Sequence, residues 1–208
     1  RNIFIGLIST LIGLRLYLSA VLPLTETTEA RYGEIARKML ETGNWINLLD
    51  TYSSPFWAKP PLYAWLSAAS MGLFGVNEFA ARLPAILLGI VTIYLCYITM
   101  QRHFSQHLAP RIGLITATLA GFFVGMGTVM TDPSLLFCVT LALCSWWNFH
   151  TDGEKKWGLL FFAGVGAGLV AKGPLALVLI GMPIVAYLLL NGGWLRAITT
   201  LPWRWGSI

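Results

Sequence analysis

Charged residues are scarce in this chain. They make up 11% of its 208 residues, whereas soluble domains carry about 25%. Hydrophobic residues reach 56%, and the mean hydropathy is +0.69. The few charges are clustered, so long stretches of the sequence contain none. Most side chains therefore cannot face water, and apolar runs of about 20 residues indicate helices that cross a bilayer.

Cysteine patterns that support disulfides or metal sites are also lacking. The three cysteines, Cys96, Cys138 and Cys144, lie inside apolar runs, with no CxxC pair and no neighbouring histidine cluster. Isolated cysteines of this kind are typical of small apolar side chains within helices. We therefore expect neither a disulfide framework nor a metal site built on cysteine.

Positive charge is in excess, with a formal net charge of +5. In a soluble protein this excess would suggest a nucleic-acid partner, but here most basic residues stand at the ends of apolar runs. The positive-inside rule and anionic headgroups explain that placement. We therefore expect membrane lipids around the chain and no nucleic-acid partner.

The apolar runs predict an all-α integral membrane protein with about six transmembrane helices. The first span covers 3–24, and the others lie within 79–190, at 79–100, 112–129, 134–149, 157–171 and 174–190. Arg15 falls near the middle of the first span, where an ionisable residue marks either a functional site or a side chain that snorkels to the interface. We expect residues 1–208 to be part of one transmembrane domain, in a fragment of a longer protein.

Residues 25–77 form a long first loop that holds most of the acidic residues. The apolar stripe of 29–41 predicts an amphipathic helix in the plane of the interface, with Thr28 as its N-cap and Gly43 as its stop. A second, short apolar helix is expected over 62–74, and it ends before Gly75. It is too short to span a bilayer comfortably, so we expect it to lie in or dip into the interface.

The side of the membrane follows from counting the spans. If 25–77 faces one side, the short loops on the other side hold Arg102, Arg111 and both lysines of 155–156, so that other side is cytoplasmic. Four basic residues within 25–77 are an exception to this rule. The same count brings Asp132 and Lys172, each in a tight turn between apolar helices, to the face that carries 25–77.

This outer face therefore gathers carboxylates beside cations: Glu29, Arg31, Lys59, Asp132 and Lys172. Such a set suits transfer from a lipid-phosphate donor, because cations stabilise the leaving phosphate and a carboxylate takes a proton from the acceptor. Two of these residues have simpler explanations. Asp132 could cap the helix that follows it, and Lys172 could either snorkel to headgroups or form an anion site with Gly173.

Four motifs in the right order resemble a known family: TEARYGEIARKMLETGNW, FWAKPPLYAWLSAASMGLFGVNEFAARLP, TDPSLL and AKGPLAL. They are similar to the aminoarabinose transferases and protein O-mannosyltransferases, which are C-type membrane glycosyltransferases. The resemblance implies a multi-pass protein of the bacterial inner membrane that is active at its periplasmic face. It also implies transfer of a hexosyl or pentosyl group from a polyprenyl-phosphate donor to a lipid A-like or protein acceptor.

The resemblance also assigns roles to residues. The family's acidic motif often has aspartate where this chain has Thr28, which leaves either Glu29 or Asp132 as the catalytic base. Lys59 matches the residue that binds the donor phosphate, and we expect Arg31 and Lys172 to assist it and Tyr32 to contact substrate. Ala58 stands where relatives often have glutamate. No cofactor is expected, and a divalent metal is left open.

Two other functions fit the sequence. Arg15 and the glycine-rich stretch GVGAGL of 164–169 could line a pathway in a transporter or lipid flippase, although such sites lie near the midplane and the charges here gather at one face. A non-catalytic scaffold of the cell envelope is the third hypothesis, because the usual aspartate is missing at Thr28 and the chain is short.

Overall fold

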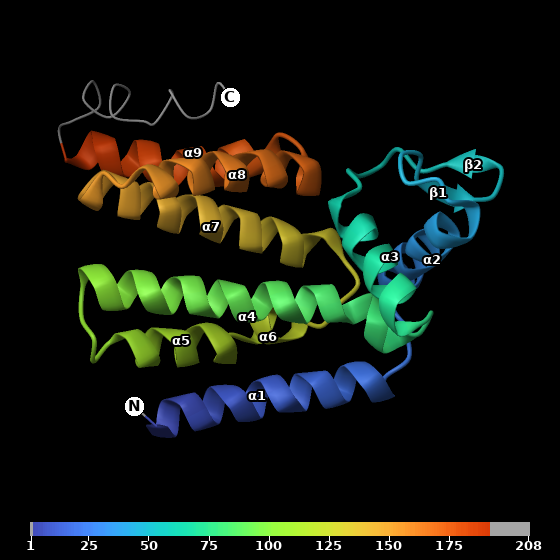
Figure 1. Ribbon diagram of the computed structural model, residues 1–208, viewed down its shortest axis with the longest axis horizontal. Helices are drawn as coiled ribbons and strands as arrows, with labels where there is room; N and C mark the ends of the chain where they lie inside the picture. Colours follow the sequence, from blue (N-terminus) through green and yellow to red (C-terminus); the bar gives the residue numbers. More distant parts are fainter. Residues whose placement is uncertain (1, 192–208) are drawn as a thin grey trace.

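The computed structural model describes residues 2–191 and is helical apart from one small hairpin (Figure 1). This confirms the predicted all-α membrane fold. The helices that run side by side along the bundle are α1 Asn2–Val21, α4 Glu78–His103, α5 Ala109–Thr118, α6 Ala120–Gly125, α7 Thr131–Asp152, α8 Lys155–Lys172 and α9 Leu175–Leu190.

Two helical stretches of the described residues, Ile3–Val21 and Glu78–His103, are long and apolar enough to cross a membrane by length and composition. Leu62–Phe74 and Leu175–Leu190 are apolar but shorter. The predicted number of six crossings remains a prediction.

Helix α4 lies at the centre of the bundle, with α1 and α5 on one side and α7 on the other (Figure 1). Helices α7 and α8 pack most closely, because Gly164 leaves no side chain between them. A Cβ on Gly164 would stand 2.9 Å from the backbone nitrogen of Ala142. One turn farther along the same face of α8, Gly168 allows a close approach to α9, because a Cβ there would stand 2.9 Å from the Cβ of Ala176.

Residues 25–77 gather at one end of the bundle, which we call the α2–α3 end (Figure 1). They form α2 Thr27–Thr42, the antiparallel strands β1 Leu49–Thr51 and β2 Ser54–Pro55, and α3 Leu62–Phe74. Apolar side chains of α2, α3 and the first turns of α4 make one buried cluster, to which Val129 also belongs. The long first loop is therefore a packed layer on the bundle rather than an extended connection.

Glycines end both helices of this layer where the sequence predicts. Gly43 has φ 65° and Gly75 has φ 85°, values that favour glycine because it has no Cβ. The prediction that Thr28 is the N-cap of α2 is wrong. Glu26 caps the helix instead, since its carboxylate accepts hydrogen bonds from the amides of Thr28 (2.8 Å) and Glu29 (2.9 Å).

The continuous helix predicted over 112–129 is also interrupted. Leu119 has ψ 120°, which separates α5 from α6, and α6 ends at Gly125. The chain then turns through 126–130 before α7 begins. The Val124 carbonyl, just before this turn, accepts a hydrogen bond from the Gly127 amide at 3.1 Å and a second one from Arg15 Nη2 at 2.7 Å. The turn is thereby tied to α1.

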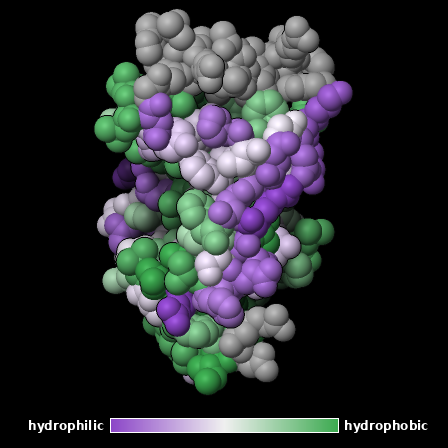
Figure 2. Space-filling view, turned by 90° about the vertical axis from the view of Figure 1, so that its left-hand side faces the viewer, coloured by the Kyte–Doolittle hydropathy of each residue, from purple (hydrophilic) through white to green (hydrophobic). Residues whose placement is uncertain are grey.

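The opposite end of the bundle is polar over much of its surface (Figure 2). Arg102 of α4 pairs with Asp152 at 2.7 Å and also with Glu154. Hydrogen bonds from Lys156 and Arg102 hold the pKa of the Glu154 carboxyl below its ordinary value. These ion pairs tie the ends of α4, α7 and α8 together.

Candidate functional site

Tyr32 contacts another of the predicted site residues, Lys59. It lies on α2 with only 5% of its surface exposed. Lys59 Nζ stands 5.7 Å from the centre of its ring, and Phe56 packs edge-on at 5.9 Å. A cation over an aromatic face is held by the electron density of the ring. The segment before α3 is thereby fixed against α2.

Lys59 lies in a pocket of about 300 Å³ at the α2–α3 end. The pocket walls come from two short stretches, 46–48 and 55–61, and include Trp57 and the prolines that follow Lys59. Within residues 2–191, no carboxylate is within ion-pair distance of its ammonium. Lys59 is therefore available to bind an anion from outside the chain.

Asp132 and Lys172 form an ion pair at the same end of the bundle. Asp132 is in the first turn of α7 and Lys172 is the last residue of α8. The side chain of Asp132 is 57% exposed, and it does not cap α7. Leu62, at the start of α3, packs against the cluster of Leu135 and Ala171 just below this pair. The pair therefore adjoins the Lys59 segment.

Electrostatics connects these groups. Burial raises the pKa of the Tyr32 phenol, and the negative charge of Asp132 raises it further, while Lys172 and Arg31 oppose the shift. Tyr32 is thus within electrostatic reach of both members of the Asp132–Lys172 pair. Four of the predicted residues, Tyr32, Lys59, Asp132 and Lys172, converge on one small region.

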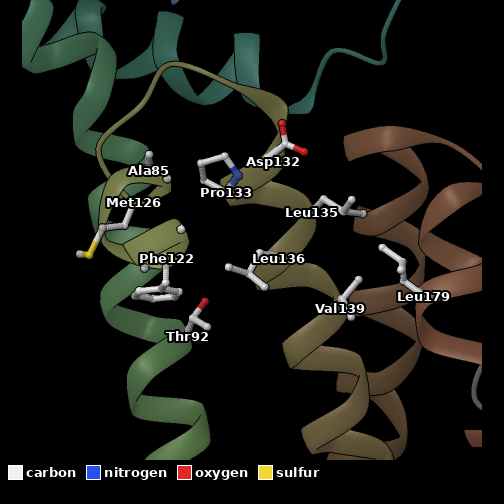
Figure 3. Close-up of a pocket in the computed structure, with 13 residues that line it drawn as sticks. Ala85, Thr92, Phe122, Met126, Asp132, Pro133, Leu135, Leu136, Val139 and Leu179 are labelled. Atoms are coloured by element: carbon white, nitrogen blue, oxygen red, sulfur yellow. The ribbon is translucent and has the colours of Figure 1, made fainter. Parts of the chain in front are cut away.

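An apolar pocket of about 430 Å³ opens beside Asp132. It lies between α4, α6 and α7, with Leu179 of α9 at its edge (Figure 3). Asp132 stands at one end of the pocket, and Leu136 and Val139 lie farther along α7 (Figure 3). The pocket could hold a hydrocarbon chain whose polar group lies at the Asp132 end.

Glu29 is placed differently. It is 7% exposed, and its carboxylate accepts hydrogen bonds from Arg82 Nη2 at 2.9 Å and from the Val129 amide at 2.9 Å. Because Arg82 and this amide occupy its oxygens, Glu29 is positioned to hold α2, α4 and the 126–130 turn together. Within the described part of the chain, no hydrogen bond or ion pair joins Glu29 to Lys59.

Sequence reasoning missed Arg82. Its guanidinium also donates to the carbonyl oxygens of Ser19 (3.3 Å), Leu22 and Pro23 (3.0 Å), so it fixes the end of α1 as well. One signal could have indicated it: an arginine in the second turn of a long apolar helix is costly without a partner.

Arg31 lies outside this cluster. Its side chain is 53% exposed and pairs with Asp50 at 3.7 Å. Among the described residues, no group of three or more histidine, cysteine, aspartate or glutamate side chains could hold a metal ion.

Solved structures share this fold. ArnT from Cupriavidus metallidurans bound to undecaprenyl phosphate matches 99% of this chain and 38% of its own, with a TM-score of 0.89 and 24% identity. The apo form of that protein matches 98% of this chain with a TM-score of 0.83. These likenesses establish the fold.

Curated relatives are similar along most of the chain. The undecaprenyl phosphate-alpha-4-amino-4-deoxy-L-arabinose arabinosyl transferase of Photorhabdus laumondii is 33% identical over 175 residues, which are 79% of this chain and 31% of the relative. The corresponding transferase 1 of Pseudomonas fluorescens is 31% identical over 197 residues, 84% of this chain and 34% of the relative. The chain thus spans about a third of the length of these relatives.

The dolichyl-phosphate-mannose-protein mannosyltransferase family matches residues 4–206, nearly the whole sequence. This match confirms the family resemblance that the four sequence motifs indicated. The chain is a membrane protein that belongs to the dolichyl-phosphate-mannose-protein mannosyltransferase family of glycosyltransferases.

Proposed function

We propose that the protein containing this chain is a membrane glycosyltransferase that takes a sugar from a polyprenyl-phosphate donor. The observation that carries the proposal is the position of Lys59, a cation without an ion-pair partner in the described residues, beside Tyr32 and the Asp132–Lys172 pair. Relatives named as transferases of 4-amino-4-deoxy-L-arabinose from undecaprenyl phosphate support a pentose-derived sugar.

In this mechanism, Lys59 and Lys172 bind the donor phosphate and stabilise its charge as it leaves. The acceptor oxygen attacks the anomeric carbon, the bond from that carbon to the phosphate oxygen breaks, and the polyprenyl phosphate departs with the electron pair. Asp132 takes the proton where the acceptor oxygen carries one. The apolar pocket beside Asp132 accommodates part of a lipid chain.

Of the two carboxylates, the geometry favours Asp132 as the base. Its side chain is exposed at the mouth of a pocket, whereas that of Glu29 is buried against Arg82. Glu29 then acts as a positioning residue that holds α2, and with it Tyr32, against the bundle. Arg31, paired with Asp50 and half exposed, is the least supported of the phosphate-binding candidates.

The same proposal sets the location. The short loops opposite the α2–α3 end hold the basic residues expected on the cytoplasmic side, so the site faces the periplasm from the inner membrane. A lipid such as lipid A, or a protein, would then reach the site from that side as the acceptor.

Replacement of Lys59 tests this function. Lys59→Ala in the full-length protein should lower transfer from a polyprenyl-phosphate sugar at least about 100-fold, because one preorganised contact to developing charge is lost. Lys156→Ala removes a lysine from the opposite end and serves as the control, with a rate close to that of wild type. Both are assayed in membranes with labelled donor.

Lys59→Arg keeps the positive charge and should retain more activity than Lys59→Ala. Equal thermal unfolding midpoints would show that the variants are folded. A normal transfer rate for folded Lys59→Ala would rule out the assigned role of Lys59.

A further inference from the structure

Arg15 is a buried cation that the proposed function does not use. It lies on α1, and only 9% of its surface is exposed. One guanidinium donor, Nη2, bonds to the Val124 carbonyl, and the Phe123 ring centre is 5.7 Å from Cζ. Nε is buried without a partner in the described part of the chain.

The charge of Arg15 is not balanced locally. Within residues 2–191 no carboxylate pairs with it, and Arg1 and residues 192–208 contain no aspartate or glutamate. Glu29 lines the same pocket, but its carboxylate is bound by Arg82. Two guanidinium groups and one carboxylate therefore leave one positive charge. An isolated charge within a membrane protein is costly, so a counter-ion is expected.

The space for such an ion is present. A pocket of about 230 Å³ is lined by Arg15, Ser19, Glu29, Arg82 and, on the facing turn, Gly127 and Thr128. It has no lining residue in common with the pocket that holds Lys59. The Ser19 hydroxyl is 1% exposed and has no hydrogen-bond partner among the described residues. Two unpartnered donors thus line one cavity.

Gly127 makes this arrangement possible. The guanidinium of Arg15 lies where a Cβ on Gly127 would stand. Any larger residue there would displace the cation from the pocket. Position 127 of the 126–130 turn therefore requires glycine for a steric reason. Position 121 does not, because a Cβ there would meet open space.

We propose that this pocket binds a phosphate group, with Arg15 and the Ser19 hydroxyl as its donors. Guanidinium groups match the oxygens of phosphate in paired hydrogen bonds. The mouth of the pocket includes Leu22 and Thr25, which are exposed where α1 ends. That is the level at which lipid headgroups lie beside a spanning helix, so a phospholipid phosphate can reach it. Free phosphate offers the same chemistry.

Titration of the full-length protein in a non-ionic detergent tests the proposal. A ligand that binds only the folded state raises the unfolding midpoint in proportion to its occupancy. Inorganic phosphate and short-chain phosphatidylglycerol are the two probes, at constant ionic strength. Stabilisation by both identifies a phosphate site open to solvent, and stabilisation by the lipid alone identifies a headgroup site. Each outcome supports the proposal.

Variants separate this pocket from other anion sites. All titrations use the Lys59→Ala background, which weakens phosphate binding at the proposed active site in the same way for every variant compared. Arg15→Gln and Gly127→Ala should abolish the stabilisation, whereas Arg111→Gln, which removes one charge at the opposite end, and Gly121→Ala should keep it. A failure of Lys59→Ala to affect sugar transfer leaves this experiment unchanged, so the two proposals fail separately.

Ser19→Ala distinguishes a ligand from water in the pocket. Loss of one hydrogen bond to a charged group should weaken apparent phosphate binding about tenfold. The change from serine to alanine is too small to disturb folding. If the pocket holds only water, neither probe will raise the unfolding midpoint of any of these variants, and that result would overturn the proposal. Equal stabilisation by phosphate of the proteins with arginine and with glutamine at position 15 would overturn the proposal as well.

Discussion

The Lys172 ammonium pairs with the Asp132 carboxylate where α8 ends and α7 begins. A cation in the last turn of a helix and an anion in the first turn of another each interact favourably with the dipole of their helix. The pair therefore has a structural role besides the catalytic role proposed for it. Experiments on it must separate stability from turnover.

Asp132→Asn should lower sugar transfer at least about 100-fold, the usual contribution of a general base. Its effect on the free energy of unfolding should stay below about 1 kcal/mol, because the Asp132 carboxylate is largely exposed. Glu78→Gln, which removes an acidic residue from the first turn of α4, is the matched control. A similar loss of transfer in both variants would mean that the effect is not specific to Asp132.

Arg82→Leu should destabilise the folded protein by about 3–5 kcal/mol, because it leaves the Glu29 carboxylate buried without its partner. Adding Glu29→Gln to Arg82→Leu should recover part of this loss, which a double-mutant cycle of unfolding free energies would measure. Arg31→Leu breaks an exposed pair and should cost below about 1 kcal/mol. Strictly additive effects at 29 and 82 would contradict the described contact.

Gly164→Ala should destabilise the α7–α8 contact by about 1–3 kcal/mol, because its methyl group would overlap the backbone near Ala142. Gly166→Ala on the same helix meets open space and should be neutral or slightly stabilising, since alanine favours helix. Thermal unfolding of the two variants side by side gives the comparison. Equal unfolding midpoints would contradict a close contact between α7 and α8 at Gly164.

The capping role of Glu26 should depend on pH. Hydrogen bonds, the largest from the Glu29 amide, lower the pKa of the Glu26 carboxyl from its ordinary value of 4.5. A lowered folded-state pKa gives stability that is present above pH 4.5 and is lost as the pH falls through the folded value. Glu26→Ala should therefore be less stable than wild type at pH 6, and the difference should shrink by pH 3. A constant difference would exclude this mechanism.

The bundle could be predicted from sequence because apolar runs are a one-dimensional signal, and a bilayer permits only helices along such runs here. The ends of α2 and α3 could also be predicted, since Gly43 and Gly75 adopt positive φ for local reasons. The interruption at Leu119 could not, because no proline or glycine occupies that position to mark it.

The same limit applies to the site. The motifs led to Lys59, Tyr32, Asp132 and Lys172, which the structure brings together. They could not show that Glu29 is buried, because its partner Arg82 is 53 positions away and only the packing of α2 on α4 joins them. A carboxylate that lies near cations in the sequence can thus serve in the folded protein to hold helices together.

The hydrogen bonds of Arg82 have a consequence for biosynthesis. Its guanidinium binds carbonyls in the last turn of α1 and just after it, and one of these, that of Leu22, is 60 positions earlier in the chain. The end of the first helix therefore cannot reach its final geometry when that helix enters the membrane. It is fixed only after α4 has been synthesised and has packed beside it. Assembly of this end of the protein must wait for one side chain of its next long helix.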